Sequence, residues 1–147
     1  GGPAGAPGRD ALAAGLRALF ALHVDGLLAL DAADAVVDAN PAALALIGEG
    51  AATLAGRPLL ALLAEEDRAR GAERLAAARD GAVQRWEADL LPADLGRRRV
   101  LLTAVPVGGG DDGTPDGAPH AGLMVVAQDV TAVRALEQQL AHRAFHD

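Results

Sequence analysis

The sequence contains no cysteine and no serine. Without cysteine the chain has no disulfide framework, no thiolate nucleophile and no zinc-thiolate site. Without serine a Ser-His-Asp triad is impossible, and neither a phosphate-binding loop nor a His-Glu-x-x-His motif occurs. The carboxylates are scattered over expected helix surfaces and loops. We therefore predict no catalytic residues, and we do not expect the isolated chain to be an enzyme.

Lysine is also absent, so all 13 basic side chains are arginines, and the net charge is −7. The largest basic cluster is 97–99, which is too small for a nucleic-acid-binding surface, so we expect no nucleic-acid partner. No hydrophobic run is long enough to span a membrane, because Arg17, His23 and Asp25 interrupt the apolar segment 11–30. No signal-peptide pattern begins the chain. We expect a cytoplasmic protein without direct membrane insertion.

Aromatic residues are few: two Phe, one Trp and no Tyr. A core must therefore be built mainly from Leu, Val and Ala. The length of 147 residues corresponds to one domain with appendages. Residues 1–9 are rich in Gly, Pro and Ala, and we predict that they are disordered.

The first helical periodicity covers residues 10–24, with Asp10 as a possible cap. Its apolar face comprises Leu12, Leu16, Leu19, Phe20 and His23. This flanking helix either packs on its own domain or helps to pair two subunits. The sequence leaves both interpretations open.

Residues 25–131 mix strand and helix patterns, which indicates an α+β domain. The segments 25–31 and 35–39 are short strand candidates separated by a polar turn. Asn40, Pro41 and Gly48 then supply the cap, first residue and terminator of a short helix. The later expected elements are helices ending at Arg79, strands over 84–91, 98–107 and 122–128, and a Gly/Asp-rich loop over 108–120.

The last predicted strand leads into a helix through Asp129-Val130-Thr131. Asp129 and Thr131 have short side chains that can accept hydrogen bonds from the first helical turn. The helix, over 132–147, has an apolar stripe at spacings of three and four that includes Val133, Leu136 and Leu140. No Gly or Pro ends it, so we expect it to be the truncated start of a longer signalling helix.

Three motifs resemble PAS sensor domains: Asp38-Ala-Asn-Pro-Ala-Ala-Leu44, Gly56-Arg-Pro58 and Asp129-Val-Thr131. The resemblance covers 25–131. It implies the PAS fold, a five-stranded antiparallel sheet in the order 2-1-5-4-3 with helices on one face and flanking helices at both ends. The segment 136–147 resembles the linker into a GGDEF diguanylate cyclase domain. A histidine kinase is the other common output of such domains.

The PAS resemblance also allows this sequence to be compared with the residues that cofactor-binding PAS domains use. Haem-binding PAS domains usually take a ligand from the helix that matches 69–79, which contains no His. Flavin photoadducts need a Cys, and flavin domains carry a Gln where this chain has Ala127; Gln128 would point to the opposite face. His142 and His146 share a helical face without an evident third ligand, and the acidic loop 111–116 lacks a bidentate Glu. We expect no haem, flavin or metal.

An unidentified small apolar ligand is the remaining possibility. The expected inward-facing residues that could line its pocket are Leu28, Val37, Leu44, Leu63, Trp86 and Leu101. Each of them could equally be an ordinary core residue. Trp86, which alternates with Ala88 and Leu90 on one strand face, also has an N–H that could hydrogen-bond a ligand.

These observations predict a sensory PAS module that transmits a signal to a covalently linked output domain. We expect a homodimer formed through the flanking helices, whose apolar residues are Leu12, Leu16, Leu19, Val133, Leu136 and Leu140. The signal would leave through Asp129 and Thr131, while Asn40 caps a helix of the domain. The alternative is a ligand-free structural PAS domain that only dimerises.

Overall fold

The computed structural model describes residues 11, 14–15, 17–19, 24–92, 96–107 and 122–146. The expected disordered segment 1–9, the loop 108–120 and the apolar residues Leu12, Leu16, Phe20 and His23 lie outside this set. Within the expected flanking helix, residues 11, 14–15 and 17–19 are helical, and Leu19 is 68% exposed.

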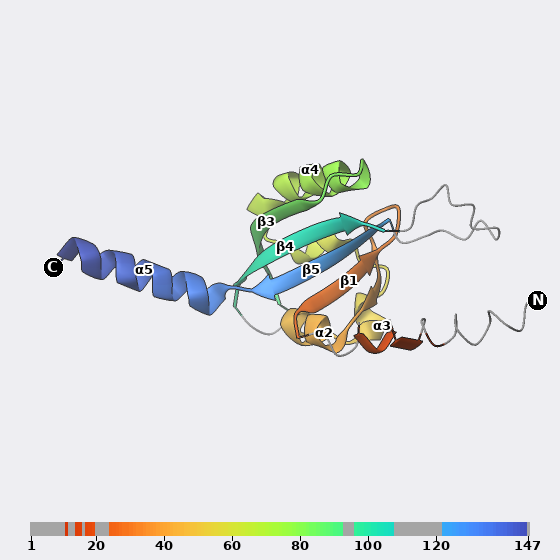
Figure 1. Ribbon diagram of the computed structural model, residues 1–147, viewed down its shortest axis with the longest axis horizontal. Coiled ribbons are helices and arrows are strands. Elements are labelled where there is room, and N and C mark those ends of the chain that lie inside the picture. The colour runs from red at the N-terminus through yellow and green to blue at the C-terminus, as the bar shows by residue number, and fades with distance from the viewer. Residues whose placement is uncertain are drawn as a thin grey trace, which may run out of the picture.

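Five antiparallel strands form one sheet in the order β2-β1-β5-β4-β3 (Figure 1). The strands are β1 (Gly26–Leu30), β2 (Val36–Ala39), β3 (Gln84–Leu90), β4 (Arg98–Pro106) and β5 (Leu123–Asp129). This is the strand order predicted from the PAS resemblance. The last strand in the chain, β5, therefore lies in the centre of the sheet, between β1 and β4.

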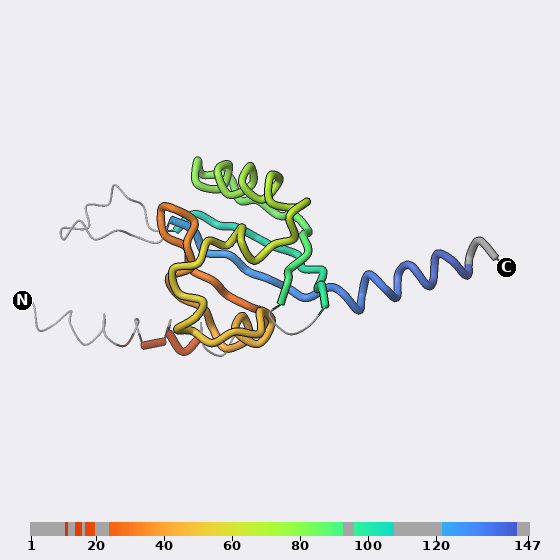
Figure 2. The backbone as a smooth tube through the Cα atoms, turned by 180° about the vertical axis from the view of Figure 1, so that it is seen from behind, coloured from red at the N-terminus to blue at the C-terminus, as the bar shows by residue number. Residues whose placement is uncertain are grey.

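The helices between β2 and β3 cover one face of the sheet (Figure 2). They are α2 (Pro41–Ile47), α3 (Ala51–Leu54), the 3₁₀ turns η1 (Leu59–Leu62) and η2 (Glu65–Asp67), and α4 (Arg68–Arg79). The C-terminal helix α5 (Thr131–His146) instead projects away from the sheet (Figures 1 and 2). Helix α3 was not predicted, because four residues are too few to show a helical period. None of the helices in the described ranges has the length and apolar character needed to cross a membrane.

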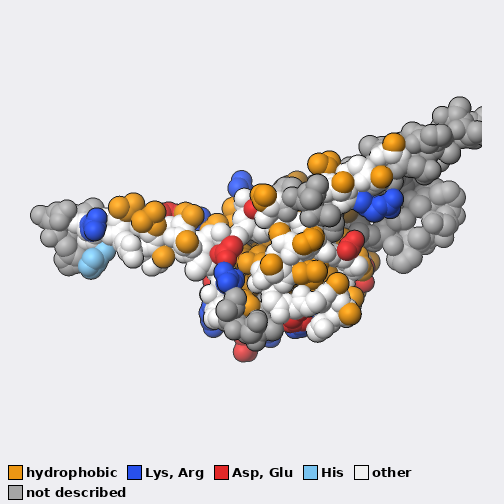
Figure 3. Space-filling model, turned by 90° about the horizontal axis from the view of Figure 1, so that it is seen from below, with side chains coloured by type: hydrophobic (Ala, Val, Ile, Leu, Met, Phe, Trp, Pro, Cys, Tyr) orange, Lys and Arg blue, Asp and Glu red, His pale blue; other side chains and the backbone are white. Residues whose placement is uncertain are grey.

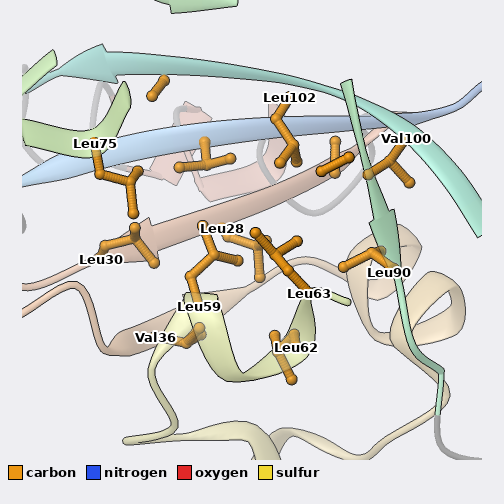
Figure 4. Close-up of a cluster of buried hydrophobic side chains, with 14 of the residues drawn as sticks. Leu28, Leu30, Val36, Leu59, Leu62, Leu63, Leu75, Leu90, Val100 and Leu102 are labelled. Carbon is orange, nitrogen blue, oxygen red and sulfur yellow. The ribbon is translucent and has the colours of Figure 1, made fainter. Parts of the chain in front are cut away.

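The core lies between the covered face of the sheet and these helices (Figure 4). Leu28 and Leu30 of β1 pack there with Leu59, Leu63 and Leu75, all at most 1% exposed. Burial of a leucine side chain contributes about 1.5–3 kcal/mol. In β3 the buried residues are Trp86, Ala88 and Leu90, as the alternating pattern predicted.

Two residues expected to face the core do not. Val37 is 50% exposed, while its neighbour Val36 is buried. Leu101 is only partly buried and lies on the opposite sheet face from Val100 and Leu102. In both places consecutive apolar residues fit either strand phase, so the pattern does not say which one faces inward. Pairing with the neighbouring strands fixes the phase, since side chains alternate strictly.

The turn between β1 and β2 is built without glycine. Asp31 Oδ1 accepts hydrogen bonds from the backbone N–H groups of Ala33 and Ala35, at 2.8 and 3.0 Å. Asp34 takes the left-handed conformation, with φ of 64°, which Asp tolerates better than most residues. Arg79, the last residue of α4, donates to the Asp31 carbonyl and pairs with the Asp34 carboxylate. The C-terminus of α4 is thus tied to this turn.

Candidate functional site

Asn40 fastens the first strand to the first covering helix. Its Oδ1 accepts hydrogen bonds from Ala43 N (2.9 Å), which caps α2, and from Leu27 N (2.8 Å) in β1. Its Nδ2 donates to the carbonyl of Asp25 at 3.0 Å. Asn40 is 1% exposed. The predicted cap is confirmed, and the same side chain satisfies backbone groups that would otherwise be buried without partners.

The step from β5 into α5 is held by side chains on two strands. Asp129 Oδ1 accepts from Thr131 N at 2.9 Å, and Asp129 Oδ2 accepts from Arg98 Nη1 at 2.7 Å. The Thr131 hydroxyl accepts from Arg99 N of β4 at 2.8 Å, and Val130 N donates to Arg99 O at 2.8 Å. The first of these bonds lies within the step itself, and the other three attach the root of the helix to β4.

The Asp129 side chain accepts a hydrogen bond from the first turn of α5, as predicted, whereas the Thr131 side chain does not. Helix α5 begins at Thr131, so this residue is already helical and its hydroxyl bonds to β4 instead of capping the first turn. The relay hypothesis expected Thr131 to hold the helix start to the domain, but its partner could not be read from the sequence, because Arg99 lies 32 residues away in the chain. Thr131 is therefore a tertiary attachment point.

A second contact joins α5 to the sheet at Glu87. Arg134, on the first turn of α5, donates from Nε and Nη2 to Glu87 Oε2 at 2.9 and 2.6 Å. The other Glu87 oxygen accepts from Arg99 Nε at 3.1 Å. Arg134 also pairs with Glu137 within the helix. Glu87 thus connects β3, β4 and α5.

Charge pairing shifts the pKa values of these groups in the direction that keeps them ionised. Hydrogen bonds from Arg134 and then Arg99 hold the pKa of Glu87 below its ordinary value of 4.5. At Asp129 burial acts to raise the pKa, but hydrogen bonds from Thr131 and Arg98 outweigh it and the pKa is lowered. Glu87, and then Glu137, raise the pKa of Arg134. All these groups are charged at neutral pH.

Sequence reasoning missed Glu87, Arg98, Arg99 and Arg134 as site residues. The alternation of Trp86, Ala88 and Leu90 leaves Glu87 on the opposite, solvated face of β3, and this was the available signal for Glu87. The partner in α5 follows 47 residues later, with no local pattern linking the two. Only the folded arrangement brings them together.

The proposed pocket residues divide into two groups. Leu28, Leu63 and Trp86 are buried in the core and Leu44 packs against it, whereas Val37 and Leu101 do not face it. Trp86 Nε1 is buried and has no hydrogen-bond partner. An unpaired buried donor costs about 1–3 kcal/mol, so a small acceptor beside it would be stabilising.

Two surface hollows lie near the ends of β1 and β2. One of about 490 Å³ adjoins the root of α5 and is lined partly by Asp25, Arg98 and Asp129. The other, of about 250 Å³, lies between β2 and α3 and includes Val37. Neither is lined by Leu28, Leu63 or Trp86. Within the described ranges, no three metal-binding side chains come together.

The apolar stripe of α5 is exposed. Val133, Leu136 and Leu140 are 52%, 55% and 56% exposed, and hydrophobic side chains line the helix where it leaves the domain (Figure 3). Exposed leucines at helical spacing are typical of a surface that pairs with another helix.

Comparison with protein families finds a match to the model described as PAS fold over residues 20–135. A comparison with curated proteins finds no match.

Solved structures share the fold at low sequence identity. The PAS domain of a protein from Colwellia psychrerythraea is 17% identical, with a TM-score of 0.71, and the match covers 82% of this chain and 98% of that one. A domain of a sensory box sensor histidine kinase/response regulator from Geobacter sulfurreducens is 24% identical, with a TM-score of 0.64 and coverage of 80% and 94%. An RNA-binding Light-Oxygen-Voltage receptor is 25% identical, with a TM-score of 0.72 and coverage of 90% and 37%.

Proposed function

The chain belongs to the PAS fold family, and we propose that it is a non-catalytic sensory module that passes a conformational signal through α5 to a covalently linked output domain. The observation that carries this proposal is the attachment of α5. The helix continues directly from the central strand β5 and is fastened at its root by Asp129, Thr131 and Arg134. Its other side chains that the structure describes, as far as residue 143, are exposed.

This geometry suits signal transfer for a mechanical reason. A central strand is paired on both sides, so a displacement of the core against it moves the strand end at Asp129. The hydrogen bonds at that end hold one orientation of the helix, and each contributes about 1 kcal/mol. Such a set of bonds can bias an equilibrium between two helix orientations, which is what a switch requires.

The proposed signal is a small apolar molecule with a hydrogen-bond acceptor, bound in the core beside Trp86. The unpartnered Nε1 of Trp86 supports this choice. A second candidate function is a ligand-free PAS domain that dimerises and spaces its neighbours. Its support is the close packing of Leu28 and Leu63, which are 1% and 0% exposed.

For the output we propose a diguanylate cyclase. The support is the resemblance of 136–147 to the linker that enters GGDEF domains. The alternative output is a histidine kinase. A cyclase would use cytoplasmic GTP, so this proposal also implies a cytoplasmic location. The residues that follow Asp147 in the parent gene test the choice of output directly.

The relay is tested in a fusion of this chain to a GGDEF domain, by measuring cyclic di-GMP formed from GTP. Asp129→Ala and Thr131→Ala should change basal output about fivefold or more, since coupling free energies between sites are commonly of that size. The melting temperature of the isolated PAS domain should change little. Thr103→Ala, on the outer face of β4, is the matched control and should leave output unchanged.

If output in the Asp129 and Thr131 variants falls only in proportion to the loss of folded protein, the relay proposal is wrong. Native mass spectrometry of the purified chain separates the two candidate signals. A retained small molecule that is lost in Trp86→Phe supports ligand sensing. A bare mass together with an unaltered melting temperature across a panel of small alcohols and ketones supports the ligand-free module. A visible absorption band would contradict the expectation that haem and flavin are absent.

A further inference from the structure

We propose that Glu87 is the residue that sets the direction of α5, and that a polar chain from Glu87 through Arg99 to Asp89 couples this direction to the segment η1–η2 that covers the core. The inference deepens the proposed function, on which it rests for the meaning of the helix direction. Its structural content can be tested without any output domain.

The contact between Glu87 and Arg134 is not a consequence of chain connectivity. Helix α5 follows β5, and β4 separates β5 from β3 in the sheet. Arg134 therefore extends beyond the neighbouring strand to reach Glu87 on the edge strand, with two of its nitrogens within 2.9 Å of one carboxylate oxygen. Both nitrogens converge on this one oxygen, which holds one edge of the guanidinium against Glu87.

Two attachment points are needed to define the direction of a projecting helix. The bonds of Asp129 and Thr131 lie close together at the first residue of α5 and act on that end of the helix only. Arg134 supplies the second point, three residues further on. Of the α5 side chains described at 131–143, all but that of Arg134 are exposed. No apolar packing within this range competes with Glu87 in orienting the helix.

Glu87 is also connected to the core through Asp89, on the same outer face of β3. The Asp89 carboxylate pairs with Arg99 at 3.3 Å, and Arg99 donates to Glu87. The Asp89 backbone accepts from Ala64 N and donates to Asp67 Oδ2, both at 2.8 Å. Ala64 and the preceding Leu63 are completely buried. A displacement of this buried segment therefore moves Asp89 and, with it, Arg99.

The energetics favour a releasable contact. The side chains of Arg134 and Glu87 are 38% and 25% exposed, and partly exposed ion pairs contribute modestly to stability. A strong, buried pair would lock the helix permanently. Because the Arg134–Glu87 pair is weak, a small displacement at Asp89 can change the populations of two directions of α5.

The test measures the direction of α5 in the isolated full chain by electron spin resonance. The chain has no cysteine, so labels are confined to two introduced sites, Thr53→Cys in α3 and Gln139→Cys in α5. Labelled protein is diluted with unlabelled protein, which removes distances between copies of a dimer. Circular dichroism and thermal melting confirm that each variant is folded.

Glu87→Gln should broaden or shift the distance distribution and increase the population of displaced distances about twofold to fivefold. Arg134→Gln should increase the displaced population by a similar factor. The double variant should show no larger increase than either single variant, since all three variants lack the same contact between Glu87 and Arg134. Glu137→Gln is the matched control. It removes the other acidic partner of Arg134, but that partner lies on α5 itself and cannot orient the helix.

An unchanged distribution in Glu87→Gln, or an equal shift in Glu137→Gln, would overturn the assignment. Asp89→Asn tests the connection to the core and should give a smaller shift in the same direction. No shift in Asp89→Asn would overturn the connection while leaving the role of Glu87 intact. If the helix turns as expected in Glu87→Gln but cyclase output of the same variant in the fusion is unaltered, the proposed function fails and this inference stands.

Discussion

At the scale of single residues, polar side chains with several partners hold the domain together. Asn40 is the one buried polar residue among those described, and it uses both its oxygen and its nitrogen. Glu87 uses both its carboxylate oxygens, on partners from two different elements. Since one change removes several contacts, these residues should respond to substitution more strongly than their neighbours.

Asn40→Ala should lower the free energy of unfolding by about 2–3 kcal/mol. The change removes a helix cap, worth about 0.5–2 kcal/mol, and leaves the Leu27 N–H without its acceptor at a further cost of about 1–3 kcal/mol. Urea unfolding followed by the fluorescence of Trp86, the only tryptophan, measures the change. Asp38→Ala is the control, because Asp38 is an exposed residue of β2 whose carboxylate accepts a hydrogen bond from the adjacent Ala39 N. Equal effects of the two substitutions would contradict the assigned role.

The contribution of Glu87 to folding stability should decrease as the pH falls into the acid range. Its pKa is lower in the folded chain than its ordinary 4.5, because Arg134 and Arg99 stabilise the carboxylate. Its stabilisation is therefore fully present above pH 4.5 and is lost as the pH falls through the lower folded-state pKa. The difference in unfolding free energy between the native chain and Glu87→Gln should be constant near neutral pH and shrink in acid. A difference that grows in acid would contradict this sign.

At the scale of elements, α5 differs from the α-helices that cover the sheet. The helices α2 and α4 place residues such as Ile47 and Leu75 in the core, whereas the apolar stripe of α5 faces solvent. Exposed apolar stripes are stabilised when two helices pair. We infer that α5 pairs with α5 of a second copy, which is the basis of the homodimer expected from the sequence.

Leu136→Glu should weaken this dimer about tenfold or more, because it places a charge in the apolar stripe. Sedimentation of the isolated chain over a range of concentrations measures the dissociation constant. Gln138→Glu adds the same charge on the opposite side of the helix and should leave the dimer intact. A native chain that remains monomeric at high micromolar concentration would refute dimerisation through α5.

At the scale of the whole molecule, the covering helices lie close against the sheet, and this closeness depends on a small residue. Gly26 at the start of β1 meets α2 so tightly that an added Cβ would lie 3.1 Å from the Cα of Ala43 and 3.3 Å from the Ala127 carbonyl oxygen. Both neighbours are backbone atoms, so no side-chain rotation could make room for the added Cβ. Gly26 thus permits α2, β1 and β5 to meet.

Gly26→Ala should lower the free energy of unfolding by about 1–3 kcal/mol, the usual cost of overpacking a core. The same urea experiment measures it. Gly50→Ala is the matched control, since a Cβ there meets no atom within 4 Å and the backbone has an ordinary φ of −80°. The prediction fails if Gly26→Ala is as stable as Gly50→Ala.

The sequence by itself determined those elements whose signals are local. Asn40, Pro41 and Gly48 identified a helix because a cap, a first-turn proline and a left-handed terminator act within a few residues of one another. The alternation of Trp86, Ala88 and Leu90 identified the buried face of β3 for the same reason. The short PAS motifs then supplied the strand order, which no local pattern contains.

Only the tertiary structure decided features that depend on residues distant in the chain. The inward phase at Val36 and at Leu102 is fixed by the paired strands, because two adjacent apolar residues satisfy a period of two equally well. Thr131 bonds to Arg99 and Glu87 to Arg134 across 32 and 47 residues. Long-range polar contacts of this kind leave no periodic trace in a sequence, since their energy depends on a geometry that exists only after the sheet has formed.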